Sequence, residues 1–191
     1  MARTPPARPD WHGRTVVCIA SGPSLTQADC DAVRGQACIV TNTSFRLAPW
    51  ADVVIGFDAA WWRLYHAEVE VTCRGRRMTL SRGACWGAES LADVPWFTSF
   101  HNSGACAIGL ALAGRAARVV LLGYDCQRTG GRTHWHGDHP AALSNAASLE
   151  RWPRLFRTVA LRAQAAGVPV LNASRATALA CFPRVTLSEV L

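Results

Sequence analysis

The stretch TVVCIASGPS, residues 15–24, decides the fold. Its first six residues form a continuous apolar run, which is typical of a strand buried on both faces of a parallel sheet. The polar turn SGPS at 21–24 ends that strand, and the spacing of Ser24 and Gln27 fits a capping box that opens a helix over 25–33. A strand, a tight turn and a helix in this order make the first unit of an α/β fold.

The same alternation of apolar runs and helical stretches continues along the chain. We expect further strands at 37–40, 52–57, 118–122 and 168–171, and helices at 59–68, 105–113 and 147–166. The stretch 69–101 predicts short strands and loops. This order predicts one Rossmann-like α/β domain, with a mainly parallel sheet and helices on both faces. We assign it to residues 15–191 and a flexible N-terminal arm to residues 1–14.

Composition bounds the class of protein. The 191 residues suffice for one domain with a core of its own. Half of them are hydrophobic and 17% are charged, which excludes global disorder. No apolar run approaches the roughly 18 residues of a membrane span, and residues 1–14 lack the apolar core of a signal peptide, so we expect a cytoplasmic protein. Eight cysteines without CxxC spacing favour reduced thiols over a disulfide scaffold.

The charge favours an anionic ligand. The net charge is +7, and all 20 basic residues are arginine, whose guanidinium pairs with phosphate in bidentate fashion. A GC-rich genome would also produce an all-arginine composition. The sequence has no recognisable nucleic-acid-binding motif, although the charge leaves a nucleic-acid acceptor open.

Polar residues follow the predicted strands directly. They are the SGPS turn at 21–24, Asn42, Asp58, Asp125 and Asn172. Each one alone is an ordinary turn or capping residue. Because the carboxyl ends of parallel strands gather at one edge of a sheet, we expect the set to share a ligand site.

Two turns that precede helices are candidate phosphate sites, since a helix N-terminus offers free N–H groups and a positive dipole end. The residues of these turns are Ser21, Gly22, Pro23 and Ser24 in the first, and Asn102, Ser103 and Gly104 in the second. Neither turn is a Walker A loop or a GxGxxG fingerprint, so neither ATPase nor NAD chemistry follows.

The loop 126–140 carries the string HxHxDH, formed by His134, His136, Asp138 and His139. Hydrolases of the metallo-β-lactamase fold bind zinc through this string, but they need further ligands downstream, and no histidine follows His139. A more limited hypothesis, without the hydrolase fold or activity, is that the cluster binds a divalent metal ion. The alternatives are a histidine general base and a plain surface loop. Arg128 and Arg132 of this loop would neutralise a leaving phosphate.

Four segments together resemble one family of Rossmann-like proteins: IASGPSL (19–25), TNTSF (41–45), NSGACAIGLALAG (102–114) and VVLLGYD (119–125). The family includes small bacterial sialyltransferases that use a CMP-activated sugar, archaeal-type 6-hydroxymethylpterin diphosphokinases and uncharacterised phage-associated proteins. The phage-associated members are the most similar, through the HWHGDHP stretch at 134–140. The resemblance spans most of residues 15–175.

This resemblance implies that residues 21–24 contact the phosphate or ribose of a nucleotide, and that Asn42 meets the nucleotide or the transferred group. It implies that Ser103 and Gly104 meet the base or sugar, and that a catalytic histidine follows the strand ending in LLGYD. The chain departs from the sialyltransferase pattern at residues 20–23, where that group has Gly-Asn-Gly-Pro. It also has only two tyrosines to match the family's tyrosine pair.

We therefore predict a transferase that uses a nucleotide-activated donor, first of all a glycosyltransferase with a histidine base and with Asp125 at the catalytic centre. The runner-up is a diphosphokinase of the pterin type, with Mg²⁺ held by Asp58 and Asp125. A third hypothesis is a non-catalytic nucleotide-binding protein of phage origin. Trp61 or Trp62 would stack on a base or pterin. The donor base, the acceptor and the oligomeric state stay open.

Overall fold

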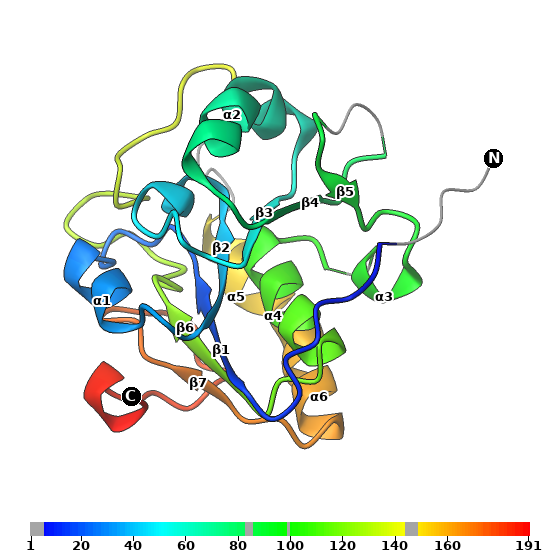
Figure 1. Cartoon of the computed structure of the whole chain (residues 1–191). Coiled ribbons are helices and arrows are strands. Elements are labelled where there is room, and N and C mark those ends of the chain that lie inside the picture. Colours follow the sequence, from blue (N-terminus) through cyan, green and yellow to red (C-terminus); the bar gives the residue numbers. More distant parts are fainter. Residues whose placement is uncertain (1–5, 83–85, 99, 144–148) are drawn as a thin grey trace.

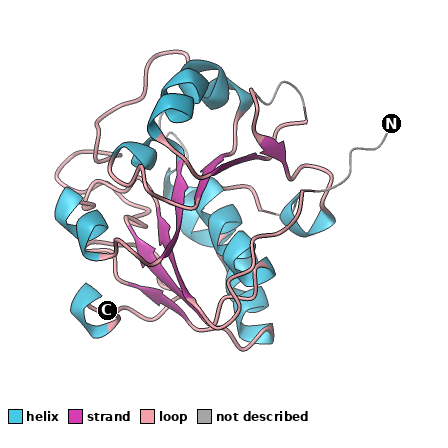
Figure 2. Ribbon diagram, viewed as in Figure 1, coloured by secondary structure: helices cyan, strands magenta, loops and turns pink. Residues whose placement is uncertain are grey.

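A computed structural model gives the fold and describes residues 6–82, 86–98, 100–143 and 149–191. Its centre is a seven-stranded, all-parallel sheet in the order β5-β4-β3-β2-β1-β6-β7 (Figures 1 and 2). The strands are β1 (Thr15–Ile19), β2 (Ala37–Thr41), β3 (Val53–Gly56), β4 (Arg76–Thr79), β5 (Glu89–Ser90), β6 (Arg118–Leu122) and β7 (Val170–Asn172). The predicted single α/β domain with a parallel sheet is confirmed.

The strand order places a topological switch point beside β1. The chain adds β2, β3, β4 and β5 on one side of β1, then returns to lay β6 and β7 on its other side. Val17 therefore pairs with Cys38 of β2 and with Val120 of β6. In an open parallel sheet, a crevice for ligands forms where the connections leave in opposite directions.

Helices cover both faces of the sheet, as the alternating direction of strand side chains requires. The helices are α1 (Gln27–Ala32), α2 (Ala59–Thr72), α3 (Pro95–Thr98), α4 (Ser103–Ala113), α5 (Trp152–Leu155) and α6 (Arg157–Ala165), with 3₁₀ turns η1 (Asn42–Arg46), η2 (Leu149–Arg151) and η3 (Leu187–Glu189). Val16 and Cys18 of β1 pack in one core with α4 and α6, whereas Val17 and Ile19 pack in a second core with α1 and α2. The buried helix α4 lies along β1, β2 and β3 (Figure 1).

The start of α1 differs from the prediction. The helix begins at Gln27, two residues later than expected, and its cap is Thr26 rather than Ser24. The side chain of Thr26 accepts from the N–H of Asp29, and the Asp29 carboxylate accepts from the N–H of Thr26, at 3.2 and 3.0 Å. The predicted Ser24–Gln27 capping box is wrong because Ser24 bonds to Asp125 instead.

The helix expected over 147–166 is interrupted. Residues 147 and 148 lie outside the described residues, and the rest divides into η2, α5 and α6. Pro153 lies in the first turn of α5, where its missing N–H leaves no helical hydrogen bond unmade. Gly167 ends α6 with a positive φ of 65°, as a glycine stop predicts.

The described residues ahead of β1 contact the domain through Trp11. Its side chain is buried, and its main-chain N–H donates to the carbonyl oxygen of Gly114 at 2.7 Å. Every cysteine in the described part of the chain is a free thiol. No helix among these residues has the length and apolar character that crossing a bilayer requires.

Candidate functional site

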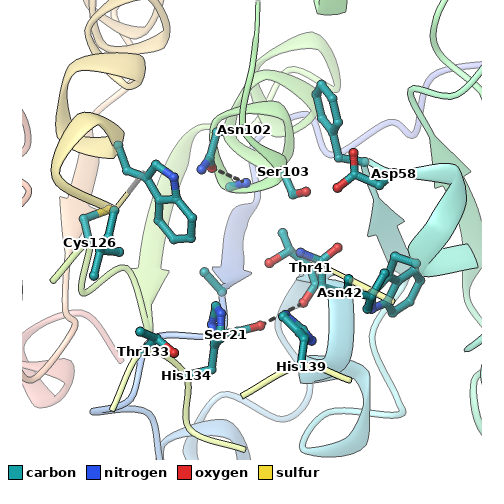
Figure 3. A pocket seen from close by; sticks show the side chains of 18 of the residues that line it. Ser21, Thr41, Asn42, Asp58, Asn102, Ser103, Cys126, Thr133, His134 and His139 are labelled. Carbon is teal, nitrogen blue, oxygen red and sulfur yellow. Dashed lines mark hydrogen bonds between the residues drawn. The ribbon is translucent and has the colours of Figure 1, made fainter. Parts of the chain in front are cut away.

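A cavity of about 650 Å³ opens at the carboxyl edge of the sheet, beside the switch point between β1 and β6 (Figure 3). Pockets for small ligands span roughly 300–1,000 Å³. Of the residues predicted from sequence, the structure brings ten to its lining: Ser21, Gly22, Asn42, Asp58, Trp61, Asn102, Ser103, Gly104, His134 and His139. Others are not part of the lining: Pro23, Ser24, Trp62, Asp125, Arg128, Arg132, His136, Asp138 and Asn172.

The turn after β1 packs directly against the turn after β6. The N–H of Gly22 donates to the carbonyl oxygen of Gly123 at 2.7 Å. A Cβ at position 22 would collide with Oδ1 of Asp125 and lie 2.5 Å from the Gly123 oxygen. Glycine is therefore required at position 22 by the packing of the two turns.

Asp125 holds these turns together. Its carboxylate accepts from the N–H and the hydroxyl of Ser24, at 2.9 and 2.8 Å, and from the hydroxyl of Thr129 at 3.1 Å. Burial raises the pKa of Asp125, although the hydrogen bonds from Ser24 oppose this. Because Asp125 does not line the cavity, only Asp58 of the two carboxylates required by the diphosphokinase hypothesis reaches it.

Asp58 presents a carboxylate to the cavity. It occupies the N-cap position of α2, yet its side chain caps no N–H group of that helix. Desolvation raises the pKa of Asp58. An ionised carboxylate only accepts hydrogen bonds, so this group suits a hydroxyl or amino group of a ligand.

The two tryptophans after Asp58 have different positions. Trp61 lines the cavity, and its indole N–H donates to the hydroxyl of Thr43 at 3.4 Å. Trp62 is fully buried and donates to the carbonyl oxygen of Gly56 at 3.0 Å. Of this pair, Trp61 is the one that can contact a ligand in the cavity.

The N-terminus of α4 lies across the cavity from Ser21 and His134 (Figure 3). Asn102 caps this helix, because its Oδ1 accepts from the N–H groups of Gly104 at 2.8 Å and Ala105 at 3.3 Å. The positive end of an eleven-residue helix thus faces the cavity. The N-terminus of α1 does not line the cavity, so only one of the two predicted helix ends reaches it.

Within the described part of the chain, no arginine lines the cavity. Arg128 and Arg132 are exposed, and Arg132 forms a tight turn with Thr129 around two glycines of positive φ. A phosphate bound in the cavity therefore meets no guanidinium group among the described lining residues.

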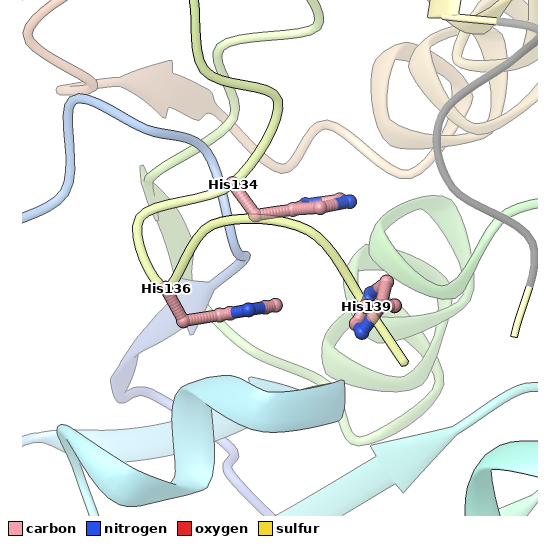
Figure 4. A group of neighbouring side chains, drawn as sticks. All are labelled: His134, His136 and His139. Carbon is pink, nitrogen blue, oxygen red and sulfur yellow. The ribbon is translucent and has the colours of Figure 1, made fainter. Parts of the chain in front are cut away.

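Three histidines of the 126–140 loop lie together. The rings of His134 and His136 stack with centroids 5.2 Å apart and planes 6° apart, and the His139 ring is inclined at 53° to both (Figure 4). Burial, and then the charge of neighbouring imidazoles, lowers the pKa of His134 and of His136 to about 4. Burial also lowers the pKa of His139. Asp138 is exposed and accepts from the Thr133 hydroxyl at 3.2 Å, outside the histidine cluster.

Sequence reasoning missed part of the cavity. Thr41 and Thr133 line it, as do His101, Trp152 and Phe156. Thr41 ends β2, so its place at the strand edge was a usable signal. Trp152 and Phe156 come from α5 and its end, and no local pattern indicates that this segment returns to the sheet edge.

No family model matches the chain, and no curated protein matches it. Among solved structures, the fold is similar to that of the sialyltransferase CstII from Campylobacter jejuni, solved in complex with a substrate analogue, cytidine-5'-monophosphate. The similarity has a TM-score of 0.49 at 11% sequence identity and covers 89% of this chain and 84% of that chain.

Proposed function

We propose that this protein is a group-transfer enzyme that binds a nucleotide-activated donor in the cavity, with glycosyl transfer as its reaction. The observation that carries the proposal is the composition of the cavity wall. At the switch point of a parallel sheet, it combines the Ser21–Gly22 turn, the end of α4, the Asp58 carboxylate and two histidines. A phosphate, a ribose and a reacting hydroxyl each find a matching group there.

The donor phosphate belongs between Ser21 and the N-terminus of α4. The hydroxyl of Ser103 can donate to its oxygens, and the dipole of α4 favours negative charge at this point. The hydroxyl of Ser21 can donate as well once it turns away from the Ser44 hydroxyl, 3.0 Å away, and the Thr41 carbonyl oxygen, 3.5 Å away. Asp58 would repel phosphate, but its carboxylate can accept from ribose hydroxyls or from a base amino group. This difference orients the nucleotide, with its sugar or base toward Asp58.

The acceptor belongs beside His134 and His139. Transfer requires that the acceptor hydroxyl attack the anomeric carbon of the donor sugar while the bond to the nucleotide phosphate breaks. The proton of the hydroxyl leaves toward the histidine wall, where an imidazole lone pair can take it. The nucleotide leaves with the electron pair of the broken bond, stabilised by the end of α4.

A ligand panel tests the proposal. We expect CMP, CDP, UDP or GDP to raise the unfolding temperature, because a ligand at about 100 times its Kd adds roughly 2.7 kcal/mol of stability. Asp58→Asn should weaken the response to the same nucleotide by about tenfold in Kd, whereas the exposed Asp31→Asn should not change it. No response to any nucleotide would refute the proposal. If the protein binds a nucleotide but transfers no sugar, it is a nucleotide-binding protein and not a transferase.

A further inference from the structure

We infer that His134, His136 and His139 form a binding site for one divalent transition-metal ion, of the kind that zinc represents. Each of the three residues offers a ring nitrogen, and these nitrogens all lie within 4.8 Å of one another. The inference does not depend on the proposed function, because the cluster is defined by the loop itself and not by the nucleotide.

The geometry is close to that of a three-histidine metal site. Zinc binds imidazole nitrogen at about 2.0–2.1 Å, so nitrogens at the corners of a tetrahedron lie about 3.3 Å apart. Starting from 4.8 Å, shifts of about 1 Å per ring would bring the nitrogens to this spacing. The rings of His134 and His136 run parallel and both point toward His139, which closes the gap between them (Figure 4). Because an imidazole lone pair lies in the plane of its ring, the two parallel rings must also rotate toward each other to direct their nitrogens at one ion.

One nitrogen of the cluster lacks a partner. Nε2 of His136 is buried and has no hydrogen-bond partner among the described residues. A buried polar atom in this state is unfavourable, and native proteins rarely leave one unsatisfied. A bound ion would satisfy this nitrogen.

The surroundings tolerate a cation. The carboxylate of Asp138 lies next to the cluster in sequence and is held by the hydroxyl of Thr133 at 3.2 Å. Arg46 is a positive charge that acts on His136. The Arg46 guanidinium is neutralised by Glu68 through hydrogen bonds of 2.6 and 2.7 Å. The histidine cluster therefore faces an Arg46–Glu68 ion pair and not an unpaired positive charge.

The ion would reach the cavity. His134 and His139 line it, and three protein ligands leave a tetrahedral ion with one open position. Zinc there polarises a bound oxygen and adds two positive charges to a cavity that has no arginine in its described lining. The ligand for that position is an oxygen of a phosphate, a hydroxyl or water. An imidazole whose lone pair binds the ion cannot also take a proton, so with the ion bound neither His134 nor His139 is the base of the proposed transfer.

Metal binding can be measured on the whole chain without a nucleotide. After chelation and removal of the chelator, we expect isothermal titration with Zn²⁺ to give one ion per chain. Co²⁺ should give the visible absorption of a tetrahedral complex. His134→Ala, His136→Ala and His139→Ala should each weaken Zn²⁺ binding by more than about 100-fold, since loss of an outer-shell partner alone costs roughly 10–100-fold. His101→Ala is the matched control, because His101 lines the cavity outside the cluster.

Two outcomes would overturn the inference. One is the absence of stoichiometric Zn²⁺ or Co²⁺ binding by the folded wild-type chain. The other is unchanged binding in a chain that lacks all three imidazoles. If a single alanine variant does not fold, the Co²⁺ spectrum of the wild-type protein and the His139→Asn variant decide. Metal binding in a protein that binds no nucleotide would refute only the proposed function, and nucleotide binding without metal would refute only this site.

Discussion

The main-chain N–H of Trp135 donates a hydrogen bond to the carbonyl oxygen of Ser21 at 3.2 Å and so ties the histidine loop to the turn after β1. The indole N–H of Trp135 donates to the hydroxyl of Ser44, also at 3.2 Å. Ser44 in turn donates to the carbonyl oxygen of Ala20 at 3.0 Å. His134 and His136 flank Trp135, so these bonds place both histidines at the sheet edge.

Replacing the Trp135 indole should measure this attachment. Trp135→Phe keeps an aromatic ring but removes the donor to Ser44, so we expect a loss of about 1 kcal/mol in the free energy of unfolding. The matched control is Trp50→Phe, because the indole nitrogen of Trp50 is buried without a hydrogen-bond partner among the described residues. Urea denaturation of both variants separates the hydrogen bond from the smaller ring. An equal loss in both would show that the bond to Ser44 contributes nothing.

The strands could be predicted because their signal is local. The runs at 15–19 and 118–122 are apolar almost throughout, as buried parallel strands require, and Ser21 and Asp125 come shortly after them. Once the strands are parallel, their carboxyl ends must share an edge. The placement of Ser21, Asn42 and Asp58 around one cavity follows from that geometry.

The roles of individual polar residues could not be predicted because they depend on tertiary partners. Two capping boxes, Ser24–Gln27 and Thr26–Asp29, fit the same local sequence. The carboxylate of Asp125 selects between them by taking the hydroxyl of Ser24. Asp125 itself follows a strand like any ligand-binding carboxylate, and only the packing of Gly22 against it shows that it holds the turns together.

Asp29 makes the stability of the fold depend on pH. Burial alone would raise the pKa of Asp29, but hydrogen bonds from Arg175 and Thr26 lower it below its usual 3.8. A lowered pKa in the folded state means that the contribution is complete above pH 3.8 and is lost as the pH falls through the folded value. Arg175 reaches both carboxylate oxygens, at 2.8 and 2.9 Å.

Arg175→Ala tests this linkage. Because the arginine side chain is 60% exposed, solvent screening limits the expected loss at pH 7 to about 1 kcal/mol. The difference from wild type should shrink as the pH falls below the usual pKa of an aspartate. Arg34→Ala removes an exposed pair with Asp31 at 3.5 Å and should change little at any pH. A constant difference between pH 7 and pH 3 would show that Arg175 acts through packing and not through the Asp29 charge.

The N-terminus of α4 allows phosphate binding to be separated from stability. Asn102 caps the helix through one side-chain oxygen, and an aspartate at this position would present a similar oxygen together with a negative charge. Asn102→Asp should therefore keep the free energy of unfolding within about 0.5 kcal/mol, since aspartate is as good an N-cap as asparagine. The added charge would face any phosphate held at this end of α4.

We accordingly expect Asn102→Asp to weaken nucleotide binding by at least about tenfold, which corresponds to about 1.4 kcal/mol. Asn102→Ala is the counterpart, because it loses the cap to Gly104 and Ala105 and should cost about 1 kcal/mol of stability without adding charge. Calorimetric titration of both variants with the same nucleoside diphosphate distinguishes the two effects. If Asn102→Asp binds as tightly as wild type, the phosphate does not lie at the end of α4, and its position between Ser21 and that helix is wrong. If the affinity falls in Asn102→Asp alone, the phosphate lies close to the end of α4. The added negative charge then explains the loss, because α4 is capped in this variant as in the wild type.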